Sequence, residues 1–294
     1  RTNQGYKVKI LVAKDAGYCF GVRDAVNLAK KSGQDYEAVY MLGDIVHNER
    51  VVSDLEKSGS VVVNSVDDIP EDKPVLFRAH GTDPKIWKDA QKKKLNIIDA
   101  TCPLVTEIHE EIKILESENR KTIIIGDHGH DEVMGIASQV KNPIIISNVE
   151  EAQKIGRLRK AGVVSQSTQM IENVQEIINV LMEKVYDLRF VNTICYPTRK
   201  NHTQVKELAN ISDMMIIIGS FTSANSKRLT ELSKIRNKNS YQVVDENDIK
   251  KEWFKDVETI GVSAGASTPD NIIEKVIEKI HSVSNKNSKE KIYE

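Results

Sequence analysis

The sequence is poor in cysteine, and the cysteines it has are widely spaced. Three of its 294 residues are cysteine, namely Cys19, Cys102 and Cys195. An odd number with no closely spaced pair does not suit a disulfide framework, so a reducing compartment is expected. Structural zinc usually takes four ligands from closely spaced pairs, which are missing here. The cysteines therefore have to be interpreted from their positions in the fold.

The chain also lacks an excess of charge and a long apolar run. Lys and Arg number 42 against 43 Asp and Glu, so no overall positive field exists to attract nucleic acid or an anionic membrane. The longest apolar runs, such as Met214–Ile218, have the length of a strand and fall far below the roughly 18 residues of a membrane helix. We therefore expect no nucleic-acid partner and no membrane partner.

Nucleotide-binding motifs are absent as well. Neither Gly-x-x-x-x-Gly-Lys nor Gly-x-Gly-x-x-Gly stands at a strand–helix junction. A bound nucleotide or nicotinamide is therefore not predicted. A redox reaction would have to take its electrons from another protein, and the expected donor is a ferredoxin or flavodoxin.

A threefold repeat organises the sequence. Three segments read as an apolar strand, a short turn, a cysteine and an amphipathic helix, and a second strand with a polar turn follows each one. The spacing from the cysteine to this polar turn is 28 residues in all three pairs: Cys19 and His47, Cys102 and His130, Cys195 and Ser223. Two further strands complete each repeat, at 61–63 and 75–77, 144–146 and 162–164, 241–244 and 260–262.

Strands of this kind, alternating with helices, predict an α/β protein with mostly parallel sheets. We expect three similar α/β units around a pseudo-threefold axis, with a cluster at the centre. The first unit is expected at residues 20–102, the second at 103–191, and the third at 192–281 together with 7–19.

The two ends of the chain carry separate expectations. Residues 282–294 are rich in Lys, Asn, Ser and Glu, which predicts a frayed tail. The chain begins at Arg1 and not at Met, as a shortened or processed protein would. The expected location is the cytoplasm if the protein is bacterial, or a plastid-type organelle after removal of a targeting peptide.

The three cysteines share one structural position. Each follows a strand and begins a helix, where backbone N–H groups lower the pKa of a thiol and favour the thiolate. One such cysteine is usually a small buried hydrophobe, but three at equivalent positions indicate a common ligand. We expect Cys19, Cys102 and Cys195 to bind one 4Fe-4S cluster whose fourth iron is open to substrate, and the Cys102-Pro103 turn is common around such clusters.

Short polar side chains lie in the turns after the other strands. Singly, each is more typical of a cap or a surface group. Because parallel strands gather their ligands at the carboxyl ends, together they form a ring of donors that can hold a phosphate or diphosphate without a P-loop. The ring consists of His47, His80, His130, Ser223, Asn225 and Ser267.

Two adjacent carboxyl groups, Asp131 and Glu132, are candidates for a general acid. Burial beside an anionic cluster and a diphosphate would raise the pKa of a carboxyl group and keep it protonated near neutral pH. Spacing alone does not choose between the two residues.

Eight motifs in order resemble those of the 4-hydroxy-3-methylbut-2-enyl diphosphate reductases, the family that catalyses the last step of the non-mevalonate isoprenoid pathway. The resemblance runs from about Val8 to Ile280. The motifs are Ala16–Val22, Val46–Asn48, Arg78–Gly81, Asp99–Val105, Gly129–Val133, Ile194–Tyr196, Ser223–Ser226 and Ala264–Ser267.

The resemblance implies a three-lobed α/β oxidoreductase that removes the substrate hydroxyl as water with two electrons and two protons. Isopentenyl and dimethylallyl diphosphates are the implied products. Glu132 is similar to the family's proton source, His130 to a pocket histidine, and Ser167 to a hydroxyl that contacts the substrate alcohol. The residues implied to hold the diphosphate are His47, His80, Ser223, Asn225 and Ser267.

Three departures from the family pattern stand out. The position of Ser167 is often threonine, and the neighbouring Thr168 could share its role. Ala224 replaces a common serine, so only its backbone N–H can serve the diphosphate. The stretch Pro197–His202 after the third cysteine also differs from the expected sequence.

Two alternative functions fit part of the pattern. An iron-sulfur dehydratase of a small anionic substrate would use the open iron as a Lewis acid and would need no electron donor. A non-enzymatic, cluster-based redox sensor would leave the ring of polar donors without a purpose.

Overall fold

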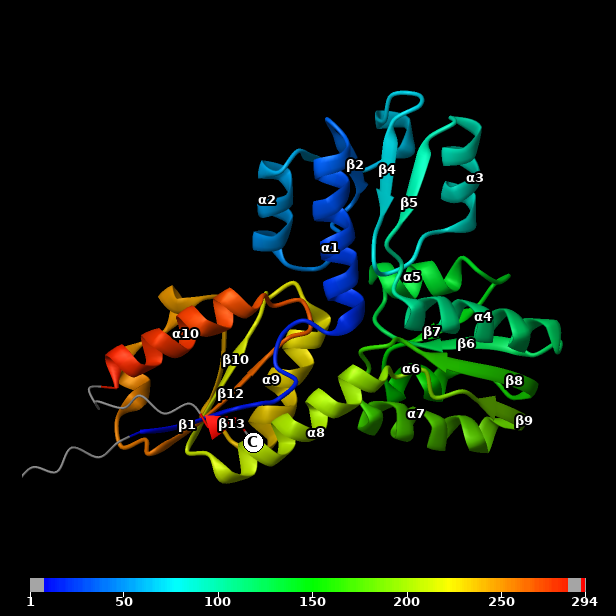
Figure 1. Cartoon of the computed structure of the whole chain (residues 1–294). Coiled ribbons are helices and arrows are strands. Elements are labelled where there is room, and N and C mark those ends of the chain that lie inside the picture. Colours follow the sequence, from blue (N-terminus) through cyan, green and yellow to red (C-terminus); the bar gives the residue numbers. More distant parts are fainter. Residues whose placement is uncertain (1–7, 285–291, 294) are drawn as a thin grey trace, which may run out of the picture. The chain divides into compact units, whose positions relative to one another are not determined.

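The described residues, 8–284 and 292–293 of this computed structural model, form three parallel β-sheets with helices between the strands (Figure 1). The strand order is the same in each: β3-β2-β4-β5, β7-β6-β8-β9 and β11-β10-β12-β1, the last extended by β13. The predicted class of three similar α/β units with mostly parallel sheets is therefore confirmed. The pseudo-threefold axis and the domain boundaries stay predictions.

An aromatic pair joins the first sheet to helix α3. Phe77 of β4 meets Trp87 of α3 edge to face, with ring centroids 5.0 Å apart. Leu42, Val63 and Val75 of the strands belong to the same buried cluster, together with Ala90 of this helix. The strands are β2 (Val39–Leu42), β3 (Ser60–Val63), β4 (Pro74–Phe77) and β5 (Asn96–Asp99), and the helices are α1 (Phe20–Asp35), α2 (Glu49–Lys57), the 3₁₀ turn η1 (Val66–Asp68) and α3 (Pro84–Lys92).

The second sheet is apolar on both faces, because alternate residues of a strand point to opposite sides. Ile123 and Ile125 of β6 pack with α7, whereas Ile124 between them packs with α4 and α5. The strands are β6 (Lys121–Ile125), β7 (Ile144–Ile146), β8 (Leu158–Ser165) and β9 (Val185–Phe190), and the helices are α4 (Pro103–Ser117), α5 (Asp131–Ala137), α6 (Val149–Lys154) and α7 (Ile171–Lys184).

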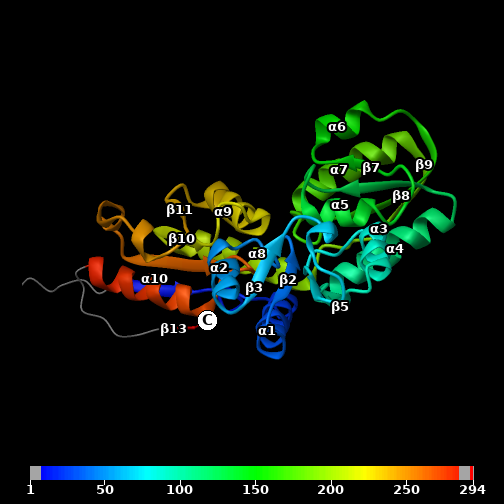
Figure 2. The ribbon, with the colours of Figure 1, turned by 90° about the horizontal axis from the view of Figure 1, so that it is seen from above.

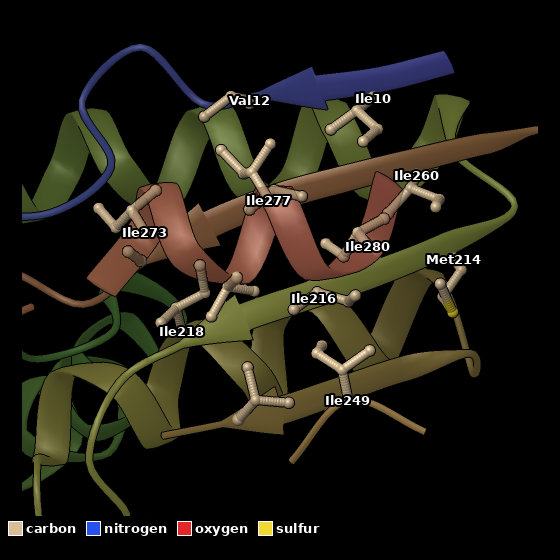
Figure 3. Close-up of a cluster of buried hydrophobic side chains, with 14 of the residues drawn as sticks. Ile10, Val12, Met214, Ile216, Ile218, Ile249, Ile260, Ile273, Ile277 and Ile280 are labelled. Carbon is tan, nitrogen blue, oxygen red and sulfur yellow. The ribbon is translucent and has the colours of Figure 1, made fainter. Parts of the chain in front are cut away.

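The third sheet takes its fourth strand from the start of the chain. Helix α10 covers one face, and α8 and α9 cover the other (Figures 1 and 2). Figure 3 shows Ile273, Ile277 and Ile280 of α10 lying against the strands. The strands are β1 (Lys9–Val12), β10 (Met214–Ile218), β11 (Ser240–Val243), β12 (Thr259–Ala264) and β13 (Ile292–Tyr293), and the helices are α8 (Tyr196–Ile211), α9 (Ala224–Arg236), η2 (Glu246–Asp248), η3 (Lys251–Phe254) and α10 (Asp270–Val283).

The chain divides into two compact units. Unit 1 contains the third sheet: the residues up to Phe20, the short segment His47–Glu49, and the residues from Tyr196 onwards. Unit 2 contains the first and second sheets, at Gly21–Val46 and Arg50–Cys195. The segment His47–Glu49 therefore leaves the first sheet and packs with the third.

Two expectations concern the ends and the membrane. The predicted tail at 282–294 lies largely outside the described residues; within it, α10 continues to Val283 and β13 pairs with β1. No helix in the described part of the chain is long and apolar enough to cross a bilayer.

Candidate functional site

The predicted site residues fall into two groups, one in each unit, and each group is described by itself. The group in unit 1 consists of Cys19, His47, Ser223, Asn225 and Ser267. The group in unit 2 consists of His80, Cys102, His130, Glu132, Ser167 and Cys195.

In unit 1, the turn at His47 is fastened to the turn after β12. The Asn48 side-chain amide donates a hydrogen bond to the carbonyl oxygen of Ser267 over 2.9 Å. The hydroxyl of Ser267 donates to the carbonyl oxygen of His47 over 3.1 Å. The structure thus brings together two predicted diphosphate-binding residues that are 220 positions apart in the sequence.

Glu49 fastens the same turn to a second one, after β10. The hydroxyls of Ser220 and Thr222 each donate to Oε1 of Glu49 over 2.9 Å. Burial raises the pKa of this carboxyl group, but its own backbone N–H, the two hydroxyls and His47 together hold the pKa below its ordinary value. Sequence reasoning missed Glu49, although its position two residues after His47 was a usable signal.

The start of α9 supplies the other predicted donors of unit 1. Ser223 is the N-cap, and its hydroxyl oxygen accepts from the backbone N–H of Ser226 over 3.3 Å. Asn225 is buried, and among the described residues no hydrogen-bond partner reaches its Oδ1. A helix N-terminus with buried polar groups is a suitable place for an anion.

Two glycines allow this turn to approach the sheet closely. The Ser226 hydroxyl is fully buried, and a Cβ added at either Gly219 or Gly265 would overlap it. Both glycines directly follow strands of the third sheet. A larger residue at either place would push α9 away from the strand ends.

In unit 2, the two cysteines hold equivalent places. The backbone N–H of Cys102 donates to the carbonyl oxygen of Ala79 over 3.0 Å, and that of Cys195 to the carbonyl oxygen of Ser167 over 2.9 Å. Each cysteine is thus tied to the turn after the neighbouring strand of its sheet, and each is half-buried. Gly21 lies against the Cys102 Sγ so closely that a Cβ there would overlap it.

Glu132 is the most buried carboxyl group among the predicted site residues, with 2% of its surface exposed. The backbone N–H of Ser167 donates to its Oε1 over 2.6 Å, and the hydroxyl of Ser167 donates to its Oε2 over 2.8 Å. The residue similar to the family's proton source and the residue similar to the hydroxyl that contacts the substrate alcohol are therefore in contact. Thr168 is half-buried.

The two predicted histidines of unit 2 lie next to each other at the start of α5. His130 caps α5, and its Nδ1 accepts from the backbone N–H of Glu132 over 3.2 Å. The rings of His80 and His130 meet edge to face, with centroids 5.9 Å apart. The two predicted substrate-binding histidines are thus in contact, and one of them caps the helix turn that carries the predicted acid.

Asp131 has a different environment from Glu132. Its carboxylate forms an ion pair with Arg78 over 2.8 Å, and a third of its side chain is exposed. Both partners line a cavity of about 440 Å³ that also borders Thr82 and Met134. The two adjacent carboxyl groups therefore point to opposite sides of α5.

Two buried residues that the sequence reasoning missed support these turns. Gln166 accepts a hydrogen bond from the backbone N–H of Asp127 over 3.1 Å. His109 of α4 lies under the turn at Gly81, where φ is +87° and a Cβ would overlap the imidazole ring. Burial, with a smaller effect of Lys113, lowers the pKa of His109 to about 4, so this residue is a neutral packing group at neutral pH.

The comparisons with known proteins agree with one another. A protein from Geobacter sulfurreducens named 4-hydroxy-3-methylbut-2-enyl diphosphate reductase is 36% identical over 95% of this chain and 99% of its own. A protein of the same name from Geobacter metallireducens is 35% identical over 94% of this chain and 98% of its own.

Two solved structures are similar. The E-1-hydroxy-2-methyl-but-2-enyl-4-diphosphate reductase from Plasmodium falciparum has a TM-score of 0.90 and 30% identity, covering 94% of this chain and 88% of its own. A structure described as (E)-4-hydroxy-3-methyl-but-2-enyl diphosphate reductase has a TM-score of 0.68 and 37% identity, covering 94% of this chain and 99% of its own. The sequence model described as LytB protein matches residues 10–281. This chain therefore belongs to the LytB family.

Proposed function

We propose that this protein reduces 4-hydroxy-3-methylbut-2-enyl diphosphate. Two electrons and two protons replace the C–O bond of the alcohol by a C–H bond and release the hydroxyl as water. The products are isopentenyl and dimethylallyl diphosphates. The observation that carries the proposal is the buried contact of Glu132 with Ser167, on the turn whose carbonyl group holds Cys195.

The residues present suit the 4Fe-4S cluster that the proposal requires. Cys102 and Cys195 lie at helix starts, where the backbone N–H groups favour a thiolate, and Cys19 precedes α1 in the same way. Glycine at position 21 lets the start of α1 approach the Sγ of Cys102 closely, because the Cβ of any other residue would overlap the sulfur. Bound by these three cysteines, the cluster would supply the electrons and an open iron site.

In this proposal the diphosphate is held by hydroxyl, amide and imidazole donors. The turns of His47, Ser223 and Ser267 are already fastened together in unit 1, so little ordering is needed when the anion binds. The N-terminus of α9 adds backbone N–H groups. His80 of unit 2 is the remaining proposed donor.

The proposed proton donor is Glu132, with Ser167 as its relay. Both oxygens of Glu132 accept hydrogen bonds from Ser167, which is the pattern of a carboxylate that has given up its proton. When Glu132 is protonated, the Ser167 hydroxyl can accept from it and donate to the substrate alcohol. A general acid at this place contributes about 10²- to 10⁴-fold to the rate.

Anaerobic reconstitution with iron and sulfide tests the proposal directly. The expected result is a brown protein with four irons and four sulfides per chain that converts the substrate only when a reductant such as dithionite is present, the stoichiometry following from a 4Fe-4S cluster. Turnover without a reductant would favour the dehydratase. A cluster without measurable diphosphate binding would favour the redox sensor.

The electron donor and the location are parts of the same proposal. A small acidic redox protein, a ferredoxin or flavodoxin, is the proposed donor, in the cytoplasm of a bacterium or in a plastid-type organelle. Reduction of the substrate by each purified donor, with dithionite replaced by a reductase, compares the two.

A further inference from the structure

The ion pair of Arg78 and Asp131 joins two sheets within unit 2. Arg78 directly follows β4 of the first sheet, and Asp131 is the first residue of α5, which packs on the second sheet. The guanidinium and carboxylate groups are 2.8 Å apart, and 27% and 33% of the two side chains are exposed. The same Nη1 lies close to Gly43, where φ is +72° and an added Cβ would come within 2.9 Å of it.

The two faces of helix α5 have different surroundings. Glu132, Val133 and Ile136 are buried toward the second sheet. Asp131 and Met134 of the helix and its C-cap Ser138 line the cavity on the other side. On this second face, the first residue of α5 is joined to the turn after β4 by the ion pair with Arg78.

A second contact joins α5 to the same turn one helical turn later. A Cβ at Gly135 would come within 3.3 Å of the carbonyl oxygen of His80, so the helix backbone lies close to that turn. The carboxylate of Asp131 and a ring nitrogen of His80 are within 4.8 Å of each other. Both the first and the second turn of α5 therefore lie close to the turn after β4.

We propose that Arg78 and Asp131 form one positioning pair, which holds the first turn of α5, and with it Glu132, against the turn after β4. This inference rests on the proposed function, in which Glu132 gives the proton. A carboxyl group that moves by about 1 Å can lose up to about 100-fold in rate, so the anchor of a seven-residue helix matters for the reaction.

An ion pair at this place should also affect the affinity for the substrate, which an uncharged packing contact would not. Arg78→Met removes a positive charge near the proposed diphosphate ligand His80, so KM should rise. Asp131→Asn removes a negative charge from the same place, so KM should fall or stay unchanged. The kcat should nevertheless fall in both variants, because both release α5.

The experiment is a double-mutant cycle on the reconstituted holoenzyme, with Arg78→Met, Asp131→Asn and the double variant. Each single variant should lower kcat about tenfold, and the double variant should lose no more than the worse single one. Amide exchange of α5, followed by mass spectrometry, should become faster in all three variants. Arg78→Lys keeps the positive charge, so its kcat should lie between those of the wild type and Arg78→Met. If Arg78→Met does not fold, Arg78→Lys takes its place in the cycle.

The matched control is an exposed ion pair in the same unit. Asp89 and Lys92 of α3 are 3.1 Å apart. Asp89→Asn and Lys92→Met should leave kcat, KM and α5 exchange unchanged. Losses that add in the double variant of Arg78 and Asp131, KM changes of the same sign, or unchanged α5 exchange would overturn the inference. If the wild-type protein shows no turnover, the proposed function is wrong. The amide exchange of α5 would still test whether the ion pair holds the helix.

Discussion

Units 1 and 2 carry different side chains on turns that are equivalent in the threefold repeat. The turn after the second strand of each repeat carries His47, His130 or Ser223. The turn after the fourth carries His80, Ser167 or Ser267. The strand order is the same in the three sheets, but the side chains on these turns differ. Unit 1 presents Cys19 and His47 with three hydroxyl and amide donors, whereas unit 2 presents two thiols, two imidazoles, the Ser167 hydroxyl and the buried Glu132.

The clearest divergence lies two residues into the polar turn. Glu49, Glu132 and Asn225 occupy this equivalent place, 30 residues after the cysteine of each repeat. Glu49 accepts from two hydroxyls and fastens two turns of unit 1, whereas Glu132 accepts from Ser167 and is nearly inaccessible. The same residue type is thus a structural anchor in one repeat and the proposed acid in another.

Replacing the cysteines should have the largest effect, because it removes a ligand common to all three repeats. Cys19→Ser, Cys102→Ser and Cys195→Ser should each abolish both the visible absorption of the cluster and turnover. Iron analysis and the anaerobic spectrum are the measurements. A variant that kept a full cluster would take its cysteine off the ligand set and break the equivalence of the repeats.

Glu132→Gln should have the next largest effect, and this effect should be confined to the proton transfer. The amide keeps the size of the side chain but holds no acidic proton, so kcat should fall by about 10²- to 10⁴-fold with the cluster and KM nearly unchanged. Steady-state kinetics and the cluster spectrum check both parts.

Two variants control this prediction. Asp131→Asn should lose much less, about tenfold, because its carboxylate is paired with Arg78 and faces the cavity. Glu49→Gln, the repeat equivalent, should act on affinity and not on kcat. Normal turnover of Glu132→Gln together with a dead Asp131→Asn would transfer the acid role to Asp131.

His47→Ala should have a smaller effect that falls on binding. Removing a charge-assisted hydrogen bond to the diphosphate costs about 1.5 to 3 kcal/mol, or about 10- to 150-fold in affinity. Calorimetry with inorganic diphosphate or the substrate measures this without turnover. His80→Ala should weaken binding to a similar degree, and unchanged affinity in both variants would refute the proposed anion site.

Much of the fold was predictable from the sequence, because strand pattern and the 28-residue spacing are local signals. The strands predicted at 61–63, 75–77, 144–146, 162–164, 241–244 and 260–262 coincide with or overlap β3, β4, β7, β8, β11 and β12, and the three sheets follow from the repeat. Strand β9 begins at Val185, so most of it precedes the run at 189–191 that indicated a strand there. The supporting contacts were not predictable. These contacts join segments that are distant in the sequence, so no local pattern predicts them. They are the hydrogen bonds to Glu49, the ion pair of Arg78 with Asp131, and the packing of His109 beneath Gly81.

Ala224→Ser should have the smallest effect, and its sign is opposite to the others. Ala224 is the first residue of α9, between the N-cap Ser223 and the buried Asn225, and it is half-buried. The substitution adds a hydroxyl at a helix start that the proposal assigns to the diphosphate. One neutral hydrogen bond contributes about 0.5 to 1.5 kcal/mol, so affinity for the diphosphate should rise about 2- to 10-fold.

The thermal midpoint should change little in this variant, since serine is tolerated at the start of a helix. Ser138→Ala in unit 2, which removes a hydroxyl from the cavity face of α5, is the matched control and should leave affinity unchanged. Weaker binding by Ala224→Ser would mean that the side chain faces away from the anion or crowds it. In that case the turn before α9 would contribute only its backbone, and unit 1 would bind the diphosphate through fewer side chains than proposed.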